Sequence, residues 1–265
     1  MATNQSYMHS RIWLEEPEPD NPFAARAAYC HGYDVYGEML GNCGWADMLF
    51  LLFRGEAPSR KQRAMLEILA VALANPGPRD ASVHAAMCGG VGGSSAAASL
   101  MAALAVGAGS LGGSREISLS MEAWLACDRD VRAWRAYLAK RVEDTSLLWP
   151  ALQHPAGFDP HGTSTGTPVR QTLARLAELD AASRSAWLNA NLAAMEQASG
   201  HPLSLSGVAA AGLCDLGFAP VEGEMLFLLL RLPGAAAHAL EGRRLGHKRF
   251  PWYEIRLEDV GEERR

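Results

Sequence analysis

Two histidines stand out because of the segment in which they occur. His154 and His161 lie between residues 147 and 168, a stretch dense in Pro, Gly, Ser and Thr. Connections of this length inside a compact domain commonly carry function. An imidazole can move a proton or polarise a carbonyl near neutral pH, although a lone histidine is more often structural. The loop therefore offers two candidates for acid–base chemistry, and a structural role remains the alternative for each.

Arg231 is unusual because it lies inside the apolar segment MLFLLLRLPGAAAHAL. A guanidinium group that is buried alone costs several kcal/mol, so this side chain must be paired or must line a wet cavity. Its planar fork of donors matches a carboxylate. A salt bridge within the protein and a site for an anionic ligand both remain open.

The other polar residues exclude several kinds of chemistry. The eight histidines show no HExxH or comparable ligand spacing, and the five cysteines are scattered without a CxxC pair. We therefore expect no metal site and no disulfide framework, and we interpret the cysteines as reduced thiols. The run GGVGG at 89–93 has no GK[ST] after it, so close helix packing is favoured over phosphate binding.

Composition and charge narrow the possible partners. The 265 residues are 49% hydrophobic, which suits one large domain with at most a modest second lobe. The net charge of -5 makes nucleic acid an unexpected partner. The charge-free run from 85 to 114 consists mainly of Gly, Ala and Ser, so we expect a buried helix and no membrane span. The N-terminus has no apolar core typical of a signal peptide, which favours a cytoplasmic location.

The spacing of the apolar residues predicts an all-α chain of roughly eight to ten helices. Ser59 and Gln62 form a capping-box pattern ahead of an apolar helix that ends at Asn75, Pro76 and Gly77. No segment shows a sustained alternation typical of a strand. Further helices are predicted over 45–54, 94–106, 121–142, 168–179, 181–199, 206–216 and 221–240.

Three segments carry a resemblance to a known family. HGYDVYGEMLGNCGWADMLFLLFRGEAPSRKQRAMLEILAVALANPG resembles the opening helices of citrate synthases and citryl-CoA lyases, which have a GYD segment, a helix ending LLxGxxP and a DHG turn. DLGFAPVEGEMLFLLLRLPGAAAHALEGRRLGHKRFPWYEI resembles the close of that superfamily, and its ending is similar to the citryl-CoA lyase module of ATP-citrate lyase. VGAGSLGGSRE aligns with the family's GxxHGGAxE region. The chain is thus identified as a citryl-CoA lyase-like member of the citrate synthase superfamily.

This resemblance implies an architecture and a class of ligand. It implies a citrate synthase-like multi-helix fold over 26–257, with a small helical lobe at approximately 143–205. Residues 1–25 are expected to form an acidic, extended N-terminal arm, and 258–265 a charged tail. The family also implies a homodimer that acts on a CoA thioester of a polycarboxylate, without a permanently bound cofactor.

The family's functional residues map onto five positions of this chain. The histidine of the GxGH segment corresponds to Asp159 without a gap or to His161 with one. The aspartate of the NVDG segment corresponds to Ser206. The arginines that bind carboxylates correspond to Arg231 and Arg170. The resemblance therefore implies that His161 polarises a carbonyl and that the two arginines hold carboxylates.

Other positions depart from the family pattern. Pro76 replaces the histidine of the DHG turn, and Leu111 replaces the histidine before the paired glycines. The Ser206 hydroxyl cannot serve unaided as the acid or base that an aspartate provides. His238 and Glu241 match the family, with an expected role in packing. Two functions stay open: a carbon–carbon lyase or condensing enzyme with weak citrate synthase activity, and an inactive paralogue that binds a ligand or regulates.

Overall fold

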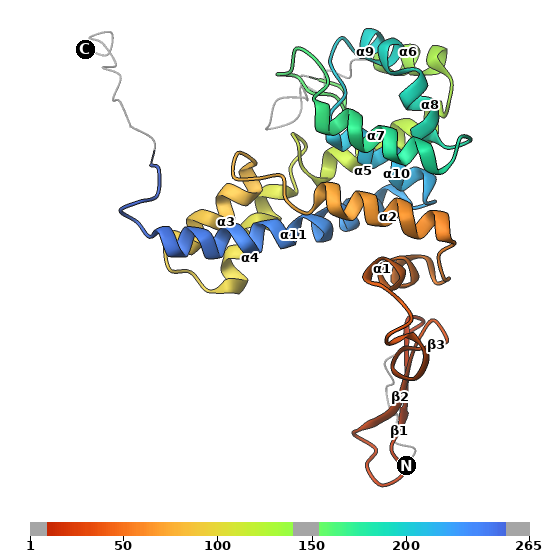
Figure 1. Cartoon of the computed structure of the whole chain (residues 1–265), viewed down its shortest axis with the longest axis vertical. Helices are drawn as coiled ribbons and strands as arrows, with labels where there is room; N and C mark the ends of the chain where they lie inside the picture. The colour runs from red at the N-terminus through yellow and green to blue at the C-terminus, as the bar shows by residue number, and fades with distance from the viewer. Residues whose placement is uncertain (1–9, 140–153, 253–265) are drawn as a thin grey trace, which may run out of the picture. The chain divides into compact units, whose positions relative to one another are not determined.

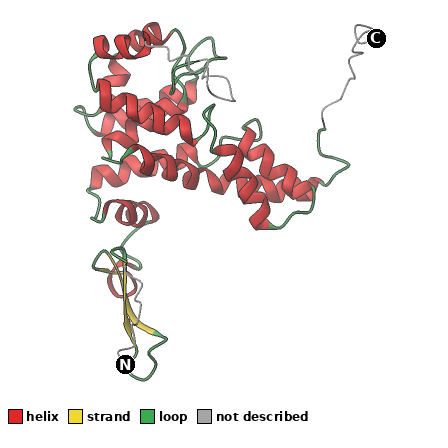
Figure 2. Cartoon of the chain, turned by 180° about the vertical axis from the view of Figure 1, so that it is seen from behind, coloured by secondary structure: helices red, strands yellow, loops and turns green. Residues whose placement is uncertain are grey.

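The computed structural model describes residues 10–139 and 154–252. Helices make up most of this part of the chain (Figure 2), which confirms the all-α prediction. The helices are α1 (Trp45–Arg54), α2 (Arg60–Leu73), α3 (Ala81–Val91), α4 (Ala96–Gly107), α5 (Ser114–Cys127), α6 (Val131–Ala139), α7 (Thr167–Leu179), α8 (Arg184–Ala190), α9 (Leu192–Ser199), α10 (Leu205–Asp215) and α11 (Pro220–Leu245).

A small antiparallel sheet precedes the helices, in the order β1 (Trp13–Pro17), β2 (Ala25–Cys30), β3 (Tyr33–Asp34). No strand was predicted from the sequence here, and that prediction was wrong. The strands are too short, and β2 too rich in alanine, to give a period-two pattern. The β2–β3 turn places His31 and Gly32 at positive φ, and a π-helical turn (Val35–Met39) follows the sheet.

The chain divides into two compact units. Unit 1 contains residues 1–74 and 107–231, and unit 2 contains 75–106 and 232–265. Helix α11 begins in unit 1 and ends in unit 2. The predicted lobe at 143–205 remains a prediction, and its residues 143–153 lie outside the described residues. The predicted tail at 258–265 lies wholly outside the described residues, since no residue after 252 is described.

The core of unit 1 forms where α5, α10 and α2 pack together (Figure 1). On α10 the run from Val208 to Ala211 is completely buried, and its small side chains let the neighbouring helices approach closely. A Cβ atom at Gly212 would lie only 3.2 Å from Leu69 of α2. On α5 Trp124 packs edge-to-face against Trp134, with ring centroids 4.9 Å apart. This packing fixes α5 and α10, the two helices that carry the candidate site.

The helix predicted over 121–142 is interrupted in the structure. Helix α5 ends at Cys127, and Asp128 adopts a positive φ of 42° that a non-glycine residue rarely takes. Asp130 then accepts a hydrogen bond from the Arg132 amide at 2.8 Å, which caps the start of α6. The prediction of one continuous helix was therefore wrong between 127 and 131, and residues 140–142 lie outside the described residues.

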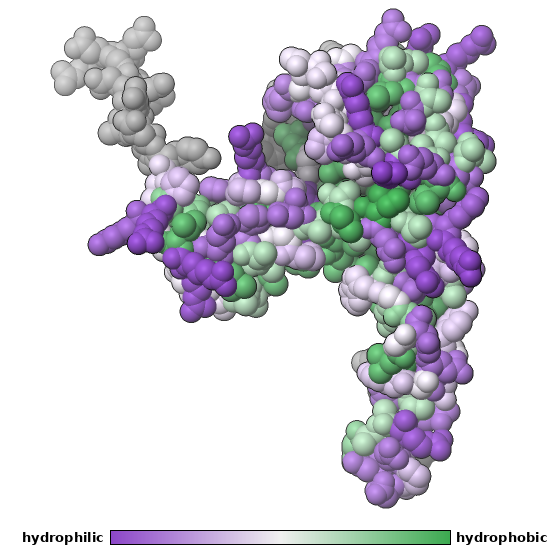
Figure 3. Space-filling model, in the orientation of Figure 1, coloured by the Kyte–Doolittle hydropathy of each residue, from purple (hydrophilic) through white to green (hydrophobic). Residues whose placement is uncertain are grey.

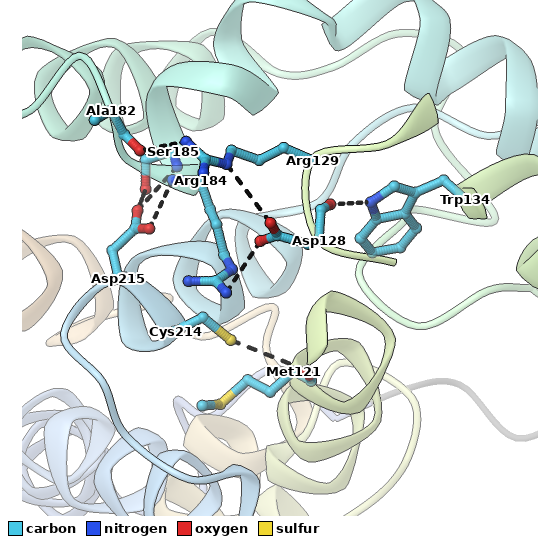
Figure 4. Close-up of polar contacts among 9 residues, drawn as sticks. All are labelled: Met121, Asp128, Arg129, Trp134, Ala182, Arg184, Ser185, Cys214 and Asp215. Carbon is cyan, nitrogen blue, oxygen red and sulfur yellow. Dashed lines mark hydrogen bonds and ion pairs between the residues drawn. The ribbon is translucent and has the colours of Figure 1, made fainter. Parts of the chain in front are cut away.

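Asp215, at the end of α10, anchors the start of α8 (Figure 4). Its carboxylate accepts hydrogen bonds from the Arg184 amide at 2.6 Å and from the Ser185 amide and hydroxyl at 2.9 and 2.7 Å. Burial raises the pKa of Asp215, while the hydrogen bonds from Ser185 oppose that shift. The Arg184 guanidinium reaches Asp128 at 3.0 Å, so one network joins α10, α8 and the turn after α5.

Unit 2 contains α3, α4 and the last part of α11. A Cβ atom at Gly90 would lie 2.0 Å from the Ala239 carbonyl oxygen, which confirms close packing for Gly90, whereas Gly93 has open space around it and a φ of 76° that favours glycine. Helix α4 buries Ser99 and Ala103 but exposes Met101 at 62%. The prediction of a buried helix over 94–106 was therefore wrong for the single chain, because α4 packs along one narrow stripe. No helix in the described ranges is long and apolar enough to cross a bilayer.

Candidate functional site

The loop around Gly157 lies against the segment that leads into α10. The Asp159 amide donates to the Pro202 carbonyl at 2.8 Å, and the Ser204 amide donates to the Gly157 carbonyl at 3.1 Å. Gly157 has a φ of 91°, and a Cβ atom at Gly207 would lie 2.2 Å from the Gly157 oxygen. Both glycines are needed for this approach. The loop that carries Asp159 and His161 is thereby fixed beside the start of α10.

Glu116 joins this loop to two other segments. The side chain is 2% exposed and lies in the first turn of α5. One of its oxygens accepts from the Gly112 amide at 2.6 Å, and the other accepts from the Gly157 amide at 2.9 Å and the Ser206 hydroxyl at 2.6 Å. A single buried carboxylate therefore holds together the Gly112 turn, the Gly157 loop and the start of α10.

Glu116 was not among the predicted site residues, although it ends the segment VGAGSLGGSRE. The sequence contained one indication that Glu116 has a specific role, because Glu116 is the first carboxylate after Asp80. A single acid at the end of a long charge-free run must meet specific donors if its helix is buried. The identity of those donors was not readable, because they come from distant parts of the chain.

Ser206 is placed at the centre of this network. It is 8% exposed, and its hydroxyl oxygen lies 2.6 Å from the hydroxyl oxygen of Ser204. Ser204 is the N-cap of α10 and accepts a hydrogen bond from the Gly207 amide at 3.3 Å. The predicted site residue is thus part of a chain of hydroxyl groups that ends at the Glu116 carboxylate.

Arg231 is buried near the same turn. Its Nη1 atom donates to the Gly112 carbonyl at 2.9 Å, and its guanidinium carbon lies 4.7 Å from the centre of the Phe227 ring. These contacts offset part of the cost of burying the charge. Gly112 consequently binds Arg231 through its carbonyl and Glu116 through its amide, so the two side chains share one turn of backbone.

The two loop histidines have different surroundings. His154 is 6% exposed, and its Nδ1 atom has no hydrogen-bond partner within the described part of the chain. Burial lowers the pKa of His154, and the charge of Glu116 opposes that shift. His161 is exposed, and its amide donates to the Asp159 carboxylate at 2.9 Å. The imidazole buried near Glu116 is therefore that of His154.

The remaining predicted residues lie apart from this network. Arg170 is exposed in the first turn of α7, and its side chain makes no hydrogen bond or ion pair with another described residue. Within unit 2, His238 bridges Glu241 at 2.7 Å and Asn75 at 3.1 Å. That bridge ties the turn next to Pro76 to α11, in agreement with the packing role expected for His238 and Glu241.

A separate groove of about 510 Å³ lies between α2 and α7. Figure 3 shows hydrophobic surface in this part of unit 1. None of the predicted site residues lines the groove, so it does not belong to the Glu116 network. Among the described residues there is no cluster of His, Cys, Asp and Glu that would hold a metal ion. The groove is lined by Ala64, Glu67, Ile68, Val71, Ala72, Gln171, Thr172 and Arg175.

Comparison with known proteins gives structural relatives only. No family model matches the sequence, and no curated protein matches it. The fold is similar to citryl-CoA lyase from Hydrogenobacter thermophilus, with a TM-score of 0.73, 18% sequence identity, and coverage of 98% of this chain and 97% of that one.

Two ATP citrate lyases are also similar. The Methanothrix soehngenii enzyme in complex with citrate and coenzyme A has a TM-score of 0.71 and 16% identity, and the match covers 98% of this chain and 43% of that chain. A variant of the Methanosaeta concilii enzyme in complex with (3S)-citryl-CoA has a TM-score of 0.69 and 16% identity, over 97% and 43%. The resemblance predicted from the sequence is thus confirmed in the fold, and this chain has the fold of citryl-CoA lyase.

Proposed function

We propose that the protein binds a CoA thioester of a polycarboxylate and belongs, by reaction class, with the lyases and condensing enzymes that break or form the carbon–carbon bond of citryl-CoA. The observation that carries this proposal is the Glu116 network. It joins the Gly112 turn, the Gly157 loop and Ser206, which lie in three segments matched by the family resemblance. The similar proteins include complexes with citrate, coenzyme A and citryl-CoA.

In this proposal each predicted residue keeps a role that its chemistry allows. Arg231 and Arg170 hold carboxylate groups, since guanidinium binds carboxylate through paired hydrogen bonds. His161 polarises a carbonyl, and Asp159 orients the loop by accepting the His161 amide. Ser206 occupies the position of the proton-transfer acid. The CoA thioester is the substrate, and no permanently bound cofactor takes part.

Turnover is expected to be weak. The Ser206 hydroxyl is bound to Glu116 and has no acidity near neutral pH, and Pro76 provides no imidazole. Cleavage of citryl-CoA, and condensation of acetyl-CoA with oxaloacetate, should therefore be absent or very slow. The same substitutions favour a second candidate function, a catalytically inactive paralogue that binds the ligand or regulates a partner.

We also propose that the protein is a homodimer. Helix α4 belongs to a charge-free segment, yet it exposes Met101 at 62% and Val106 at 46% in the single chain. A second copy of the chain would cover such surface, because a helix of this composition gains little from contact with water. Sedimentation of the full chain at micromolar concentration should give the mass of a dimer, and a monomer would contradict the proposal. The cytoplasmic location remains a prediction.

The proposed function can be tested with a panel of CoA thioesters and carboxylates. Thermal shift should detect binding, since a ligand at a hundred times its Kd stabilises the folded protein by about 2.7 kcal/mol. Formation of oxaloacetate and acetyl-CoA from citryl-CoA should detect cleavage in the same samples. Binding with slow formation of oxaloacetate would support the lyase class, and binding without any oxaloacetate formation would favour the inactive paralogue. Failure of every CoA thioester and carboxylate to bind would refute both.

A further inference from the structure

We propose that Glu116, acting through the hydroxyl groups of Ser206 and Ser204, supplies the carboxylate that position 206 itself lacks. Glu116 is then the final proton acceptor of the site, and Ser204 is the group that contacts the substrate. The proposal rests on the proposed function, because it needs a bound acyl thioester. The new element is a proton relay that consists of Glu116, Ser206 and Ser204.

The contacts give the hydroxyl chain a direction. An ionised carboxylate can only accept, so the Ser206 hydroxyl must donate its proton to Glu116 across the 2.6 Å contact. Ser206 is then available only as an acceptor for Ser204, 2.6 Å away, so the Ser204 hydroxyl donates to it. The Gly207 amide completes the chain by donating to Ser204. Every proton in the chain points toward Glu116, which is the arrangement needed to deliver a proton there.

Burial separates the two ends of this chain. Glu116 is 2% exposed and Ser206 is 8% exposed, whereas Ser204 is only partly buried. A carboxylate that no substrate could approach directly is therefore linked to a hydroxyl that one can approach. The Ser204 oxygen has a second lone pair besides the one used by Gly207. That lone pair is where a proton can enter the chain.

His154 provides an independent sign that a ligand belongs here. Its Nδ1 atom is buried and unpartnered among the described residues, and the charge of Glu116 opposes the lowering of its pKa by burial. A buried polar atom without a partner costs free energy unless something fills the site. An oxygen or nitrogen of a bound ligand close to Glu116 would satisfy it.

The proton transfer balances without another reactant. The proton at the carbon next to the thioester carbonyl passes to the Ser204 oxygen, while the Ser204 proton passes to Ser206 and the Ser206 proton passes to Glu116. The electron pair of the broken carbon–hydrogen bond stays in the enolate of the thioester. In the reverse direction Glu116 gives its proton back through the same chain, and the enolate becomes acetyl-CoA again.

The relay can be tested by following deuterium exchange at the methyl group of acetyl-CoA. The thioester is held in D2O at a saturating concentration with the full-length protein, and loss of the methyl proton signal is measured by NMR. Wild type should exchange faster than buffer. Because acid–base groups contribute about 10² to 10⁴ in rate, Ser206→Ala and Glu116→Gln should each lose about 100-fold, or all of the gain if it is smaller.

Two further variants serve as controls. One separates the charge of the Glu116 side chain from its size, and the other separates an effect on the site from an effect on folding. Glu116→Asp should restore part of the exchange that Glu116→Gln loses, although Gln is closer to Glu in size, because only Asp carries the charge. Ser185→Ala removes the equivalent hydroxyl from Asp215 and should exchange like wild type. Ser206→Ala is the milder change at the site, so the comparison holds even if Glu116→Gln folds poorly.

The outcomes of this experiment are distinct. Wild type that binds acetyl-CoA but exchanges no faster than buffer would overturn the relay and leave the proposed binding function intact. Exchange by Ser206→Ala at the wild-type rate would do the same. Wild type that binds no acetyl-CoA would overturn the relay together with its substrate, and would count against the proposed function itself.

Discussion

Two Ser-x-Ser segments start helices in unit 1, and each binds a carboxylate that is buried at Glu116 and partly buried at Asp215. In Ser183–Ser185, at the start of α8, the first serine caps the Ala186 amide and Ser185 donates to Asp215 at 2.7 Å. In Ser204–Ser206, at the start of α10, Ser204 caps the Gly207 amide and Ser206 donates to Glu116 at 2.6 Å. The two segments thus share a pattern in which the first serine caps the helix and the second donates to a carboxylate.

The carboxylates differ in what else they bind. Asp215 takes the amides of Arg184 and Ser185, so it satisfies the exposed end of the helix that it caps. Glu116 takes amides from Gly112 and Gly157, which belong to two separate loops, and none from α10. The Asp215 network thus satisfies the amides at the start of one helix, whereas the Glu116 network holds three separate segments together. The same side-chain motif serves stability in one place and a candidate site in the other.

The largest expected difference between the two networks is in their contribution to the free energy of unfolding. Glu116→Ala would leave two buried donors, the Gly157 amide and the Ser206 hydroxyl, without their acceptor, at about 1 to 3 kcal/mol each, so we expect a loss of about 2 to 6 kcal/mol. Asp215→Ala removes a cap from one helix and should cost about 2 kcal/mol. Denaturant unfolding of both variants measures the difference. Equal losses would mean that the Glu116 network is no more than a second helix cap.

Ser206→Asp tests whether the Glu116 and Asp215 networks also differ in their effect on cleavage of citryl-CoA. An aspartate there would lie against Glu116, and two carboxylates at that distance cannot both be ionised. Ser206→Asp combined with Glu116→Gln should therefore form oxaloacetate from citryl-CoA about tenfold or more faster than wild type, since a well-placed acid contributes about 10² to 10⁴. Missing histidines limit the gain. The matched Ser185→Asp variant should give none, and robust cleavage by wild type would contradict the proposed role of position 206.

Arg231→Lys tests the binding of carboxylate. Lysine keeps the charge but loses the paired donors, so affinity for citrate should fall about tenfold, which corresponds to about 1.4 kcal/mol. Arg184→Lys changes the arginine of the Asp215 network and should leave citrate affinity unchanged. Isothermal titration measures both. Unchanged affinity of Arg231→Lys for every carboxylate that binds wild type would exclude Arg231 from the site.

The smallest expected effect is on the pH dependence of the free energy of unfolding. Burial lowers the folded-state pKa of His154 below its ordinary 6.5, so the unfolded chain binds more protons between those two values. Folding stability contributed by neutral His154 is present above pH 6.5 and is lost as pH falls toward the folded pKa. His154→Gln should flatten the decline in unfolding free energy below pH 6.5. Equal slopes for wild type and His154→Gln would show that His154 is not buried as a neutral group.

Local features of the fold were readable from the sequence, and long-range ones were not. The Ser59–Gln62 capping box and the glycine end of α1 depend on neighbouring residues, and both were predicted correctly. The break after α5 was missed because Asp128 is held by Arg184, which lies far away in the sequence. Glu116 was missed for the same reason, since its partners Gly157 and Ser206 are 41 and 90 residues away. The family motif supplied the position of Ser206, but its hydrogen-bond partner required the structure.

Backbone hydrogen exchange with and without citrate and coenzyme A tests the central claim most directly, that the Glu116 network belongs to a ligand site and the Asp215 network to the fold alone. Amide protection is measured by mass spectrometry on the full chain. We expect the added ligands to slow exchange in peptides that contain Gly112, Gly157 and Ser206, because binding stabilises the segments that Glu116 holds together. Peptides containing Ser185 and Asp215 should exchange as before. Protection confined to the Asp215 network, or absent from all three Glu116 segments while the ligands bind, would contradict the account.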